Sequence, residues 1–373
     1  MILILKPTLA CNLSCKYCYL SEESKTSKLF DIEFAKSVLQ QAKNVLLADK
    51  KRRLKILWHG GEPLLWGIKN YTEIFEFIET EFDGYNYHIS IQTNLSLLND
   101  EFIDLFLKYK VGVGCSLDGP KEIHDSQRVT STGKGTFDTI IKNIELCKKK
   151  GLKIGCIVVG TKKHINKIPQ LYQFLCENNI DFKFNPIFNG GEAKKHIDEY
   201  GLTPNEYATM FTELFDLWFF DNANRLKNAV FVDIASSLIS KKGCTHCAFN
   251  KNCQHSILAI SSNGDVVPCG RFCDEELKKY TYGNLHTESL ETIWKKIELS
   301  DTYKRFEHIT NSKCNECDFF NVCYGGCLYD GYVKTGDFKS KSFLCSAYKK
   351  IFSHINNRLK DINNAQHATS DLL

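Results

Sequence analysis

The chain has 373 residues, of which 43% are hydrophobic, so an ordinary buried core is expected and global disorder is excluded. Its formal net charge of +4 comes from scattered lysines and argues against a nucleic-acid-binding surface. The N-terminus lacks the basic region of a signal peptide, and no apolar stretch approaches the ~20 residues of a membrane span. We therefore expect a soluble, cytoplasmic protein with no membrane contact.

Short β-rich runs alternate with longer amphipathic segments over the first 220 residues. The expected strands are 2–5, 54–58, 87–91, 111–116, 152–159 and 182–186. The expected helices are 31–48, 71–82, 100–108, 136–150, 166–178 and 204–220. Six β/α units in series predict an α/β fold with a parallel sheet, curled by right-handed crossovers into a full or partial (β/α)6 TIM barrel. Its active site should lie at the carboxyl ends of the strands.

The pattern changes after this region. A bridging helix is expected at 230–240, and from residue 243 the segments are short, cysteine-rich and rich in turns. Residues 257–260 and 266–267 flank a turn and predict a β-hairpin. The predicted domains are a barrel at 1–225, a linker at 226–243, a small cysteine-rich domain at 244–350, and a C-terminal helix with a polar, frayed tail at 351–373.

Seventeen cysteines are unusual for a chain of this kind. A reducing compartment argues against disulfides, so metal binding is the favoured explanation. Three cysteines lie near the N-terminus and ten fall between Cys244 and Cys345. The remaining four lie in apolar helix-like or strand-like stretches, and we expect them to be buried structural thiols. These are Cys115, Cys147, Cys156 and Cys176.

Cys11, Cys15 and Cys18 follow the first predicted strand. Three thiolates in one loop can bind three irons of a [4Fe–4S] cube and leave the fourth iron open, whereas the alternative is a zinc site that lacks one ligand. The CxxxCxxC spacing, with the aromatic Tyr17 before the last cysteine, resembles that of the radical S-adenosylmethionine (SAM) superfamily. The resemblance implies that the cluster cleaves SAM to a 5′-deoxyadenosyl radical, which abstracts a hydrogen atom. These three cysteines are therefore the expected catalytic metal ligands.

Further segments match the same family at the ends of predicted strands. Gly60-Gly61-Glu62-Pro63 follows the second strand, where glycines let a ligand approach the backbone and a carboxylate can hold an ammonium group. The resemblance implies contacts to the SAM amino group here, and to its ribose and carboxylate from Ser116 and Arg128. The alternatives without SAM binding are a helix cap for the serine and a surface cation for the arginine. The predicted SAM-binding residues are Tyr17, Gly60, Gly61, Glu62, Ser116, Arg128 and Asn185.

The C-terminal cysteines resemble the SPASM domain: a cysteine, a spaced glycine and a cysteine, then CxxCx5CxxxC and a last cysteine. The resemblance implies two auxiliary [4Fe–4S] clusters, and with the first cluster three in all. A pair of structural zinc sites is the alternative. The implied ligands of the first auxiliary cluster are Cys247, Cys253, Cys269 and Cys327. Those of the second are Cys314, Cys317, Cys323 and Cys345. Cys244 is an alternative to Cys247, and Cys273 is assigned to neither cluster.

The reaction is predicted from a single position. Sulfatase maturases of this family carry an aspartate, a proposed base, directly after the cysteine that Cys269 matches, whereas this chain has Gly270, with Asp265 or Asp274 as possible substitutes. We therefore predict a maturase that installs a thioether, C–C or C–O crosslink in a ribosomally made precursor peptide with a leader. A flavodoxin or ferredoxin would supply electrons. The alternatives are a sulfatase maturase that forms formylglycine, and a non-catalytic iron–sulfur electron carrier.

Overall fold

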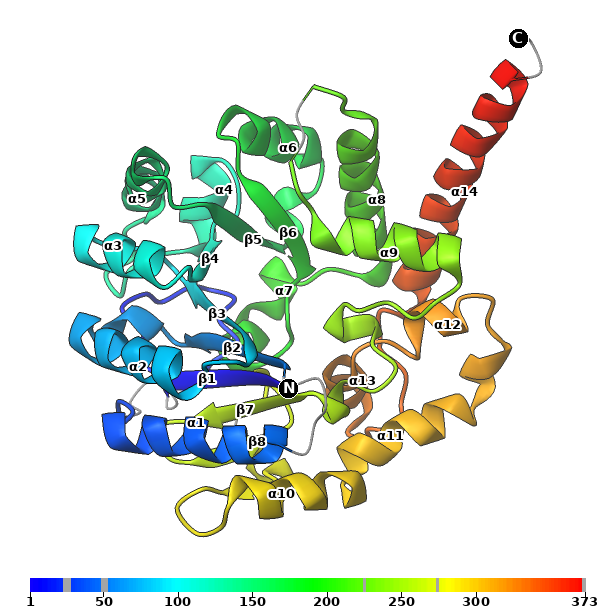
Figure 1. Cartoon of the computed structure of the whole chain (residues 1–373). Helices are drawn as coiled ribbons and strands as arrows, with labels where there is room; N and C mark the ends of the chain where they lie inside the picture. The colour runs from blue at the N-terminus through cyan, green and yellow to red at the C-terminus, as the bar shows by residue number, and fades with distance from the viewer. Residues whose placement is uncertain (23–27, 48–52, 224–225, 273–274, 371–373) are drawn as a thin grey trace. The chain divides into compact units, whose positions relative to one another are not determined.

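The computed structural model describes residues 1–22, 28–47, 53–223, 226–272 and 275–370 (Figure 1). Contacts between residues divide the chain into two units, each built from three segments. The first unit consists of Met1–Val158, Phe188–Asp198 and Gln254–Tyr303. The second consists of Val159–Ile187, Glu199–Cys253 and Lys304–Leu373. The four domain ranges expected from the sequence stay predictions.

The first unit is built on one β-sheet with the strand order β5-β4-β3-β2-β1-β7-β8-β9 (Figure 1). The strands are β1 (Ile2–Thr8), β2 (Arg53–Gly60), β3 (Asn86–Thr93), β4 (Gly112–Ser116), β5 (Ile154–Gly160), β7 (Ile257–Ser261), β8 (Asp265–Val267) and β9 (Gly283–Asn284). Neighbours from β5 to β7 pair in parallel, whereas β7–β8 and β8–β9 are antiparallel. Leu3, Leu5, Ile56 and Trp58 in the central strands are fully buried, as expected when helices cover a parallel sheet. The predicted α/β fold with parallel strands is confirmed.

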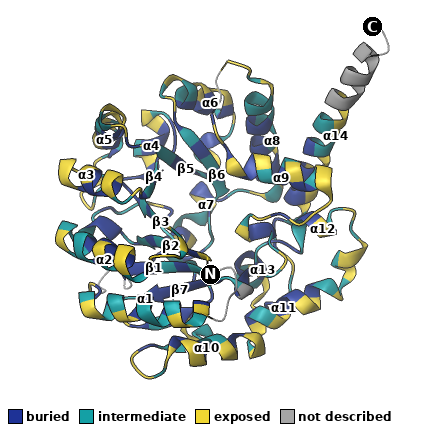
Figure 2. Ribbon diagram, in the orientation of Figure 1, coloured by how far each residue is buried: buried dark blue, intermediate teal, exposed yellow. Residues whose placement is uncertain are grey.

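Amphipathic helices cover this sheet. They are α1 (Ile32–Leu47), α2 (Ile68–Glu81), α3 (Asp100–Lys108) and α5 (Phe137–Lys150). Each buries one stripe of apolar side chains and exposes the opposite face. In the ribbon of Figure 2, buried (dark blue) and exposed (yellow) positions accordingly alternate along α1 and α2. Local signals set their ends: the Asn99 side chain accepts from the Phe102 amide (3.0 Å) at the start of α3, and Gly151, with φ +83°, ends α5.

The predicted hairpin forms and has a further partner. β7 and β8 pair through Ala259–Val267 and Ile260–Val266, and the turn uses Gly264 at φ +85°. β7 also lies directly beside β1, with Leu3 opposite Leu258. A strand from the cysteine-rich part of the sequence thus extends the N-terminal sheet, which the sequence did not predict. Two short helices, α4 (Lys121–Gln127) and α10 (Leu290–Lys296), complete this unit's main elements.

The second unit is mainly helical. It contains β6 (Asp181–Pro186), α6 (Ile168–Glu177), α8 (Pro204–Phe220), α9 (Ala229–Ser240), α12 (Phe320–Cys323), α13 (Leu328–Thr335), α14 (Cys345–Ser370) and most of α11 (Asp301–Thr310). Phe211 and Phe215 of α8 pack against Phe231 of α9, with ring centroids 5.0 and 5.4 Å apart. The helix α14 continues to Ser370, within the range 351–373 where a C-terminal helix with a frayed tail was expected. No helix in the described part of the chain is long and apolar enough to cross a membrane.

Candidate functional site

The first cysteine cluster lies on the loop that follows β1. Two of its amides, those of Ser14 and Lys16, donate to the carbonyls of Val129 and Gln127 (2.8 and 2.9 Å). The loop is thereby tied to the segment after α4. Cys11, Cys15 and Cys18 are all half-buried within this fixed loop.

The electrostatics of this loop favour binding of a cation. Burial raises the pKa of the Cys11 thiol to about 12, and the nearby Cys15 and Cys18 raise it further. Three thiols whose charges act on each other do not ionise together without positive charge between them. Metal ions supply that charge and deprotonate coordinating thiols. The three predicted ligands are thus brought together in a site whose electrostatics suit a metal cluster.

Gly60 and Gly61, at the end of β2, pack against the backbone of the cysteine loop. The Gly61 and Glu62 amides donate to the carbonyls of Thr8 and Ala10 (3.0 and 2.9 Å). A Cβ on Gly60 would lie 2.2 Å from the Thr8 oxygen, and one on Gly61 would lie 2.1 Å from the Ala10 oxygen. Glycine is therefore required here for close packing of two loops, whereas the sequence interpretation attributed it to the approach of a ligand.

Gly61→Ala is expected to destabilise the protein by about 3 kcal/mol or more, because the added methyl group meets backbone atoms that cannot move aside. Gly270→Ala is the matched control, since its Cβ would meet only Ile4 side-chain atoms at 3.5 Å or more. Chemical denaturation of both variants measures the difference. Equal stability of the two variants would contradict the packing argument.

Glu62 links the ends of β2 and β3. Its carboxylate is fully buried and accepts from the Leu64 amide (2.9 Å), the Thr93 hydroxyl (2.6 Å) and the Asn94 amide (2.8 Å). Burial raises its pKa to about 7, although the three donors oppose that shift. The carboxylate therefore fixes two strand ends beside the cysteine loop. Its contact with a SAM amino group stays a prediction.

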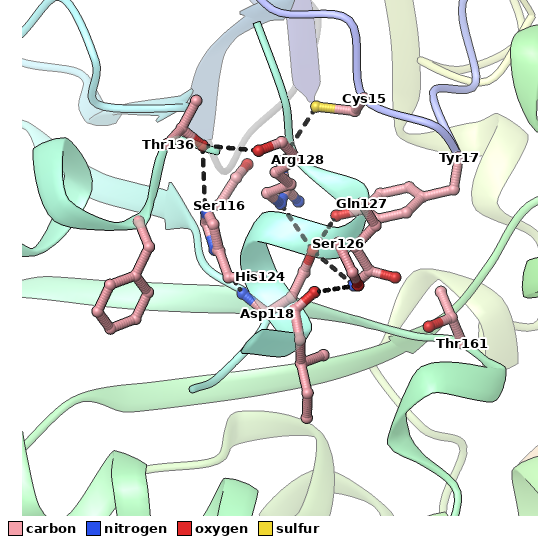
Figure 3. Close-up of polar contacts among 12 residues, drawn as sticks. Cys15, Tyr17, Ser116, Asp118, His124, Ser126, Gln127, Arg128, Thr136 and Thr161 are labelled. Atoms are coloured by element: carbon pink, nitrogen blue, oxygen red, sulfur yellow. Dashed lines mark hydrogen bonds and ion pairs between the residues drawn. The ribbon is translucent and has the colours of Figure 1, made fainter. Parts of the chain in front are cut away.

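Asp118, which follows β4, is the centre of a buried polar network (Figure 3). Its Oδ2 accepts from the Tyr17 hydroxyl, from Gln127 Nε2 (3.0 Å) and from Arg128 Nε (2.8 Å). Asp118 is fully buried and Arg128 is 7% exposed, so this is a buried ion pair. Arg128 Nη1 also lies 4.0 Å from Cys15 Sγ. The network thus orients the predicted SAM-binding Tyr17 and Arg128 beside the cysteine loop.

Sequence reasoning named Ser116 and Arg128 but gave Asp118 and Gln127 no role. A carboxylate that follows a buried strand, ten residues before an arginine, was the available signal. Ser116, at the end of β4, accepts weakly from Gln92 Nε2 (3.4 Å). Asn185 lies in β6, within the second unit. Its predicted SAM contact remains untested.

His124 of α4 is linked to the same network through the Thr136 hydroxyl. It is fully buried, and its Nε2 lies 3.0 Å from the Thr136 hydroxyl, which in turn donates to the Arg128 carbonyl (3.0 Å). Burial lowers the pKa of His124 to about 4. The imidazole is therefore neutral at pH 7, as a hydrogen-bonded core histidine should be.

This shift predicts a pH dependence of stability. Between about pH 6.5 and pH 4, His124 is protonated in the unfolded chain and neutral in the folded chain. The free energy of unfolding therefore decreases as the pH falls through this window. The loss from this residue between pH 7 and pH 5 is about 2 kcal/mol. Denaturation of wild type and His124→Gln at both pH values measures it. His88→Gln, at an exposed residue, is the control. An unchanged pH dependence in His124→Gln would contradict the assignment.

A second polar cluster surrounds Lys6, which contacts Gly270, the position where the sequence analysis looked for a base. The Lys6 ammonium, 1% exposed, donates to the Gly270 carbonyl (2.6 Å). The Tyr19 hydroxyl donates to the Gly60 carbonyl (3.1 Å). Burial, followed by the charge of Lys6, lowers the pKa of His59 to about 4. Sequence reasoning missed Lys6 and His59. For Lys6 the reason is that the periodicity of the strands does not indicate that β1 lies close to residue 270.

The role of the base is assigned to neither of the two proposed substitutes for the missing aspartate. Asp265 is engaged in the hairpin, where it accepts from Asn263 Nδ2 (2.7 Å) and Asn284 Nδ2 (2.8 Å). Asp274 and Cys273 lie outside the described residues.

Four predicted ligands surround one cavity in the second unit. Cys314 lies in the turn Lys313–Glu316, Cys317 directly after it, Cys323 at the end of α12, and Cys345 at the start of α14. All four line a cavity of about 800 Å³. Burial raises the pKa of Cys323 to about 12, and the charges of the other three contribute. The structure thus brings this predicted set together.

Cys247 of the other predicted set and its alternative, Cys244, differ in their surroundings. The Cys244 thiol is buried and donates to Asp233 Oδ2 of α9 (2.7 Å), and the same carboxylate accepts from the Thr245 and His246 amides (2.9 and 2.7 Å). Cys247, in contrast, is exposed. Cys244 therefore has a structural partner already. Three of the expected structural thiols, Cys115, Cys147 and Cys156, are buried as predicted, and Cys176 is half-buried.

The remaining predicted ligands of that set are divided between the two units. Cys253 is buried and Cys327 half-buried in the second unit, whereas Cys269 is half-buried in the first. Their grouping around one cluster stays a prediction.

Two family models match the chain. Residues 5–175 match the radical SAM superfamily, and residues 237–318 match SPASM, described as an iron–sulfur cluster-binding domain. The second match favours iron–sulfur clusters over the zinc alternative. The first match, with its full-length enzyme relatives, excludes the simple electron carrier.

The similar proteins cover nearly the whole chain. The chain is 29% identical to the cysteine-type anaerobic sulfatase-maturating enzyme of Clostridium perfringens (strain 13 / Type A), over 97% of this chain and 98% of the relative. It is 25% identical to the serine-type enzyme of Bacteroides thetaiotaomicron, over 95% of this chain and 89% of the relative. The structure of native anSMEcpe with bound AdoMet and a Cp18Cys peptide superposes with a TM-score of 0.82 at 25% identity, over 98% of this chain and 99% of the other.

These relatives overturn the predicted crosslinking of a precursor peptide. Streptococcus suis SuiB, solved with its precursor peptide, shares the fold at 20% identity and a TM-score of 0.57. Both values are lower than those of the sulfatase-maturating enzyme structure. The prediction was wrong because it rested on Gly270 alone, and one residue carries less weight than agreement along the chain. The chain belongs to the radical SAM superfamily and is a radical S-adenosylmethionine enzyme with a SPASM domain, whose cofactors are SAM and iron–sulfur clusters.

Proposed function

We propose that this enzyme oxidises a cysteine or serine side chain of a sulfatase polypeptide to formylglycine. The observation that carries the proposal is the full-length similarity to both cysteine-type and serine-type sulfatase-maturating enzymes. A related structure holds AdoMet and a cysteine-containing peptide together in the same fold. An external one-electron carrier, such as a flavodoxin or ferredoxin, supplies the reducing equivalent.

Cys11, Cys15 and Cys18 are the proposed ligands of the SAM-binding [4Fe–4S] cluster. Three half-buried cysteines on a loop fixed at both of its sides fit three irons of such a cube. When bound, the cluster and SAM together supply a carbon-centred radical that removes a hydrogen atom from the substrate. Arg128, held by Asp118, is positioned beside Cys15 and suits a carboxylate ligand. The other proposed SAM contacts are Tyr17, Gly60, Gly61, Glu62, Ser116 and Asn185.

Two auxiliary [4Fe–4S] clusters are proposed as well, which makes three in all. Cys314, Cys317, Cys323 and Cys345 would hold one of them, and their shared cavity of about 800 Å³ supports this set. Four thiols with no other metal-binding side chain among the lining residues fit a fully ligated cluster. Cys247, Cys253, Cys269 and Cys327 would hold the other.

The choice of Cys247 over Cys244 leads to a sharp prediction. Cys247→Ser should lower the iron content by about one cluster of the three, because an exposed thiol without a strong partner is available for coordination. Cys244→Ser should keep its iron, since a serine hydroxyl can also donate to Asp233. Iron and acid-labile sulfide are measured per chain in both variants. Iron loss only in Cys244→Ser would reverse the assignment.

Two matched peptides test the function. Each carries the sulfatase segment that is normally oxidised, one with cysteine and one with serine at the target position, and an alanine peptide is the control. The reconstituted enzyme is incubated anaerobically with SAM and a reductant, and aldehyde is trapped with a hydrazine and identified by mass spectrometry. We expect aldehyde in at least one of the first two peptides. Turnover of SAM without aldehyde in either would contradict the proposal.

A further inference from the structure

Arg305 is a buried cation with an incomplete set of partners. It lies in α11, and its side chain is only 1% exposed. Its Nη2 donates to the carbonyls of Gly325 (3.2 Å), Gly326 (3.1 Å) and Ser340 (3.4 Å). Its Nε and Nη1 are buried and have no hydrogen-bond partner in the structure. Among the described residues, no carboxylate forms an ion pair with it.

This arrangement is costly unless an anion is bound. Removing a charged group from water costs several kcal/mol even after the protein relaxes. A guanidinium cannot avoid that cost by losing its proton under ordinary conditions. Two unpartnered donor nitrogens on a fully buried arginine therefore indicate that negative charge occupies the space they face.

The location of Arg305 indicates which anion that is. The two glycine carbonyls that hold Nη2 belong to the turn between Cys323 and Cys327, where Gly325 and Gly326 both have positive φ. Burial lowers the pKa of Arg305, whereas the charges of four thiols raise it. In order of decreasing effect these are Cys327, Cys253, Cys323 and Cys314. Members of both proposed auxiliary ligand sets therefore lie around one guanidinium.

We propose that Arg305 donates hydrogen bonds from Nε and Nη1 to sulfur atoms of the auxiliary clusters and thereby raises the reduction potential of these clusters. The inference rests on the auxiliary ligand sets proposed above. Clusters ligated by four thiolates are anionic, and adding one electron makes them more so. A fixed cation in a medium of low dielectric constant favours the reduced form, and hydrogen bonds to sulfur act in the same direction. Arg305 would thus make the auxiliary clusters better acceptors of the electron that leaves the substrate.

The test uses the full chain with Cys11, Cys15 and Cys18 changed to alanine, so that only auxiliary clusters contribute to the signal. Arg305→Gln removes the charge and keeps a donor for the carbonyls, whereas Arg305→Lys keeps the charge. Arg358→Gln is the matched control, because that arginine of the same unit pairs with Asp216 instead (2.6 Å). Iron and sulfide are counted, and reduction is followed by electron paramagnetic resonance against solution potential.

We expect unchanged iron content and a fall of at least about tenfold in the ratio of reduced to oxidised auxiliary cluster for Arg305→Gln, which equals about 59 mV for a one-electron couple. Arg305→Lys should lie between this variant and the parent, and Arg358→Gln should match the parent. An unchanged potential in Arg305→Gln with full iron content would overturn the inference. Loss of auxiliary iron in both Arg305 variants would overturn it too, since the role would then be structural. A parent without auxiliary iron would instead refute the proposed ligand sets.

Discussion

Asp118→Ala is expected to destabilise the protein by about 3–5 kcal/mol, because it leaves Arg128 as an uncompensated buried charge. The change also removes the acceptor for the Tyr17 hydroxyl and for Gln127 Nε2. Anaerobic denaturation with urea measures the loss. The same variant should bind SAM more weakly, since Arg128 loses the partner that orients it beside Cys15.

The control for this prediction is Asp100→Ala, at the start of α3. Asp100 also pairs with a basic residue, Lys150 (2.7 Å), but the carboxylate is mostly exposed, and such pairs contribute about 0–1 kcal/mol. A loss of stability in Asp118→Ala no larger than in this control would show that the buried network is not a major stabilising element.

Cys15→Ala is expected to abolish the cleavage of SAM, because two thiolates cannot hold the proposed cluster in place. The loss should exceed the about 10–100-fold that changes in the outer shell of a metal site cause. It is measured as 5′-deoxyadenosine formed after reduction. Cys176→Ala, at a half-buried thiol bonded to Asp221 in the second unit, should retain activity. Substantial 5′-deoxyadenosine from Cys15→Ala would remove this residue from the ligand set.

The elements that the sequence predicted best are those with strong periodicity and clear end signals. The predicted helices 100–108 and 204–220 coincide with α3 and α8. α3 begins after the Asn99 cap, and α8 begins with a capping box formed by Thr203 and Glu206. In these helices local physics alone determines the ends, so the sequence was sufficient.

Contacts between distant segments could not be predicted in the same way. The pairing of β7 with β1 joins residues about 250 positions apart, and neither strand carries a signal for its partner. The Lys6–Gly270 hydrogen bond follows from that pairing, since it connects the same two regions. Gly60 and Gly61 were identified correctly as special positions, but only the structure shows that backbone carbonyls of the cysteine loop impose glycine there.

The reaction was the least predictable feature. Gly270 differs from the aspartate expected in a sulfatase maturase, and the sequence interpretation treated that difference as decisive. The structure shows a different feature at this position: the Lys6 ammonium donates to the Gly270 carbonyl, a contact that the identity of residue 270 does not reveal.

Formylglycine formation is decided by quantifying 5′-deoxyadenosine and formylglycine in the same anaerobic reaction with the cysteine and serine peptides. We expect both products to form with wild type and both to be lost in Cys15→Ala. Formation of 5′-deoxyadenosine together with a crosslinked or epimerised peptide, and no aldehyde, would contradict this expectation.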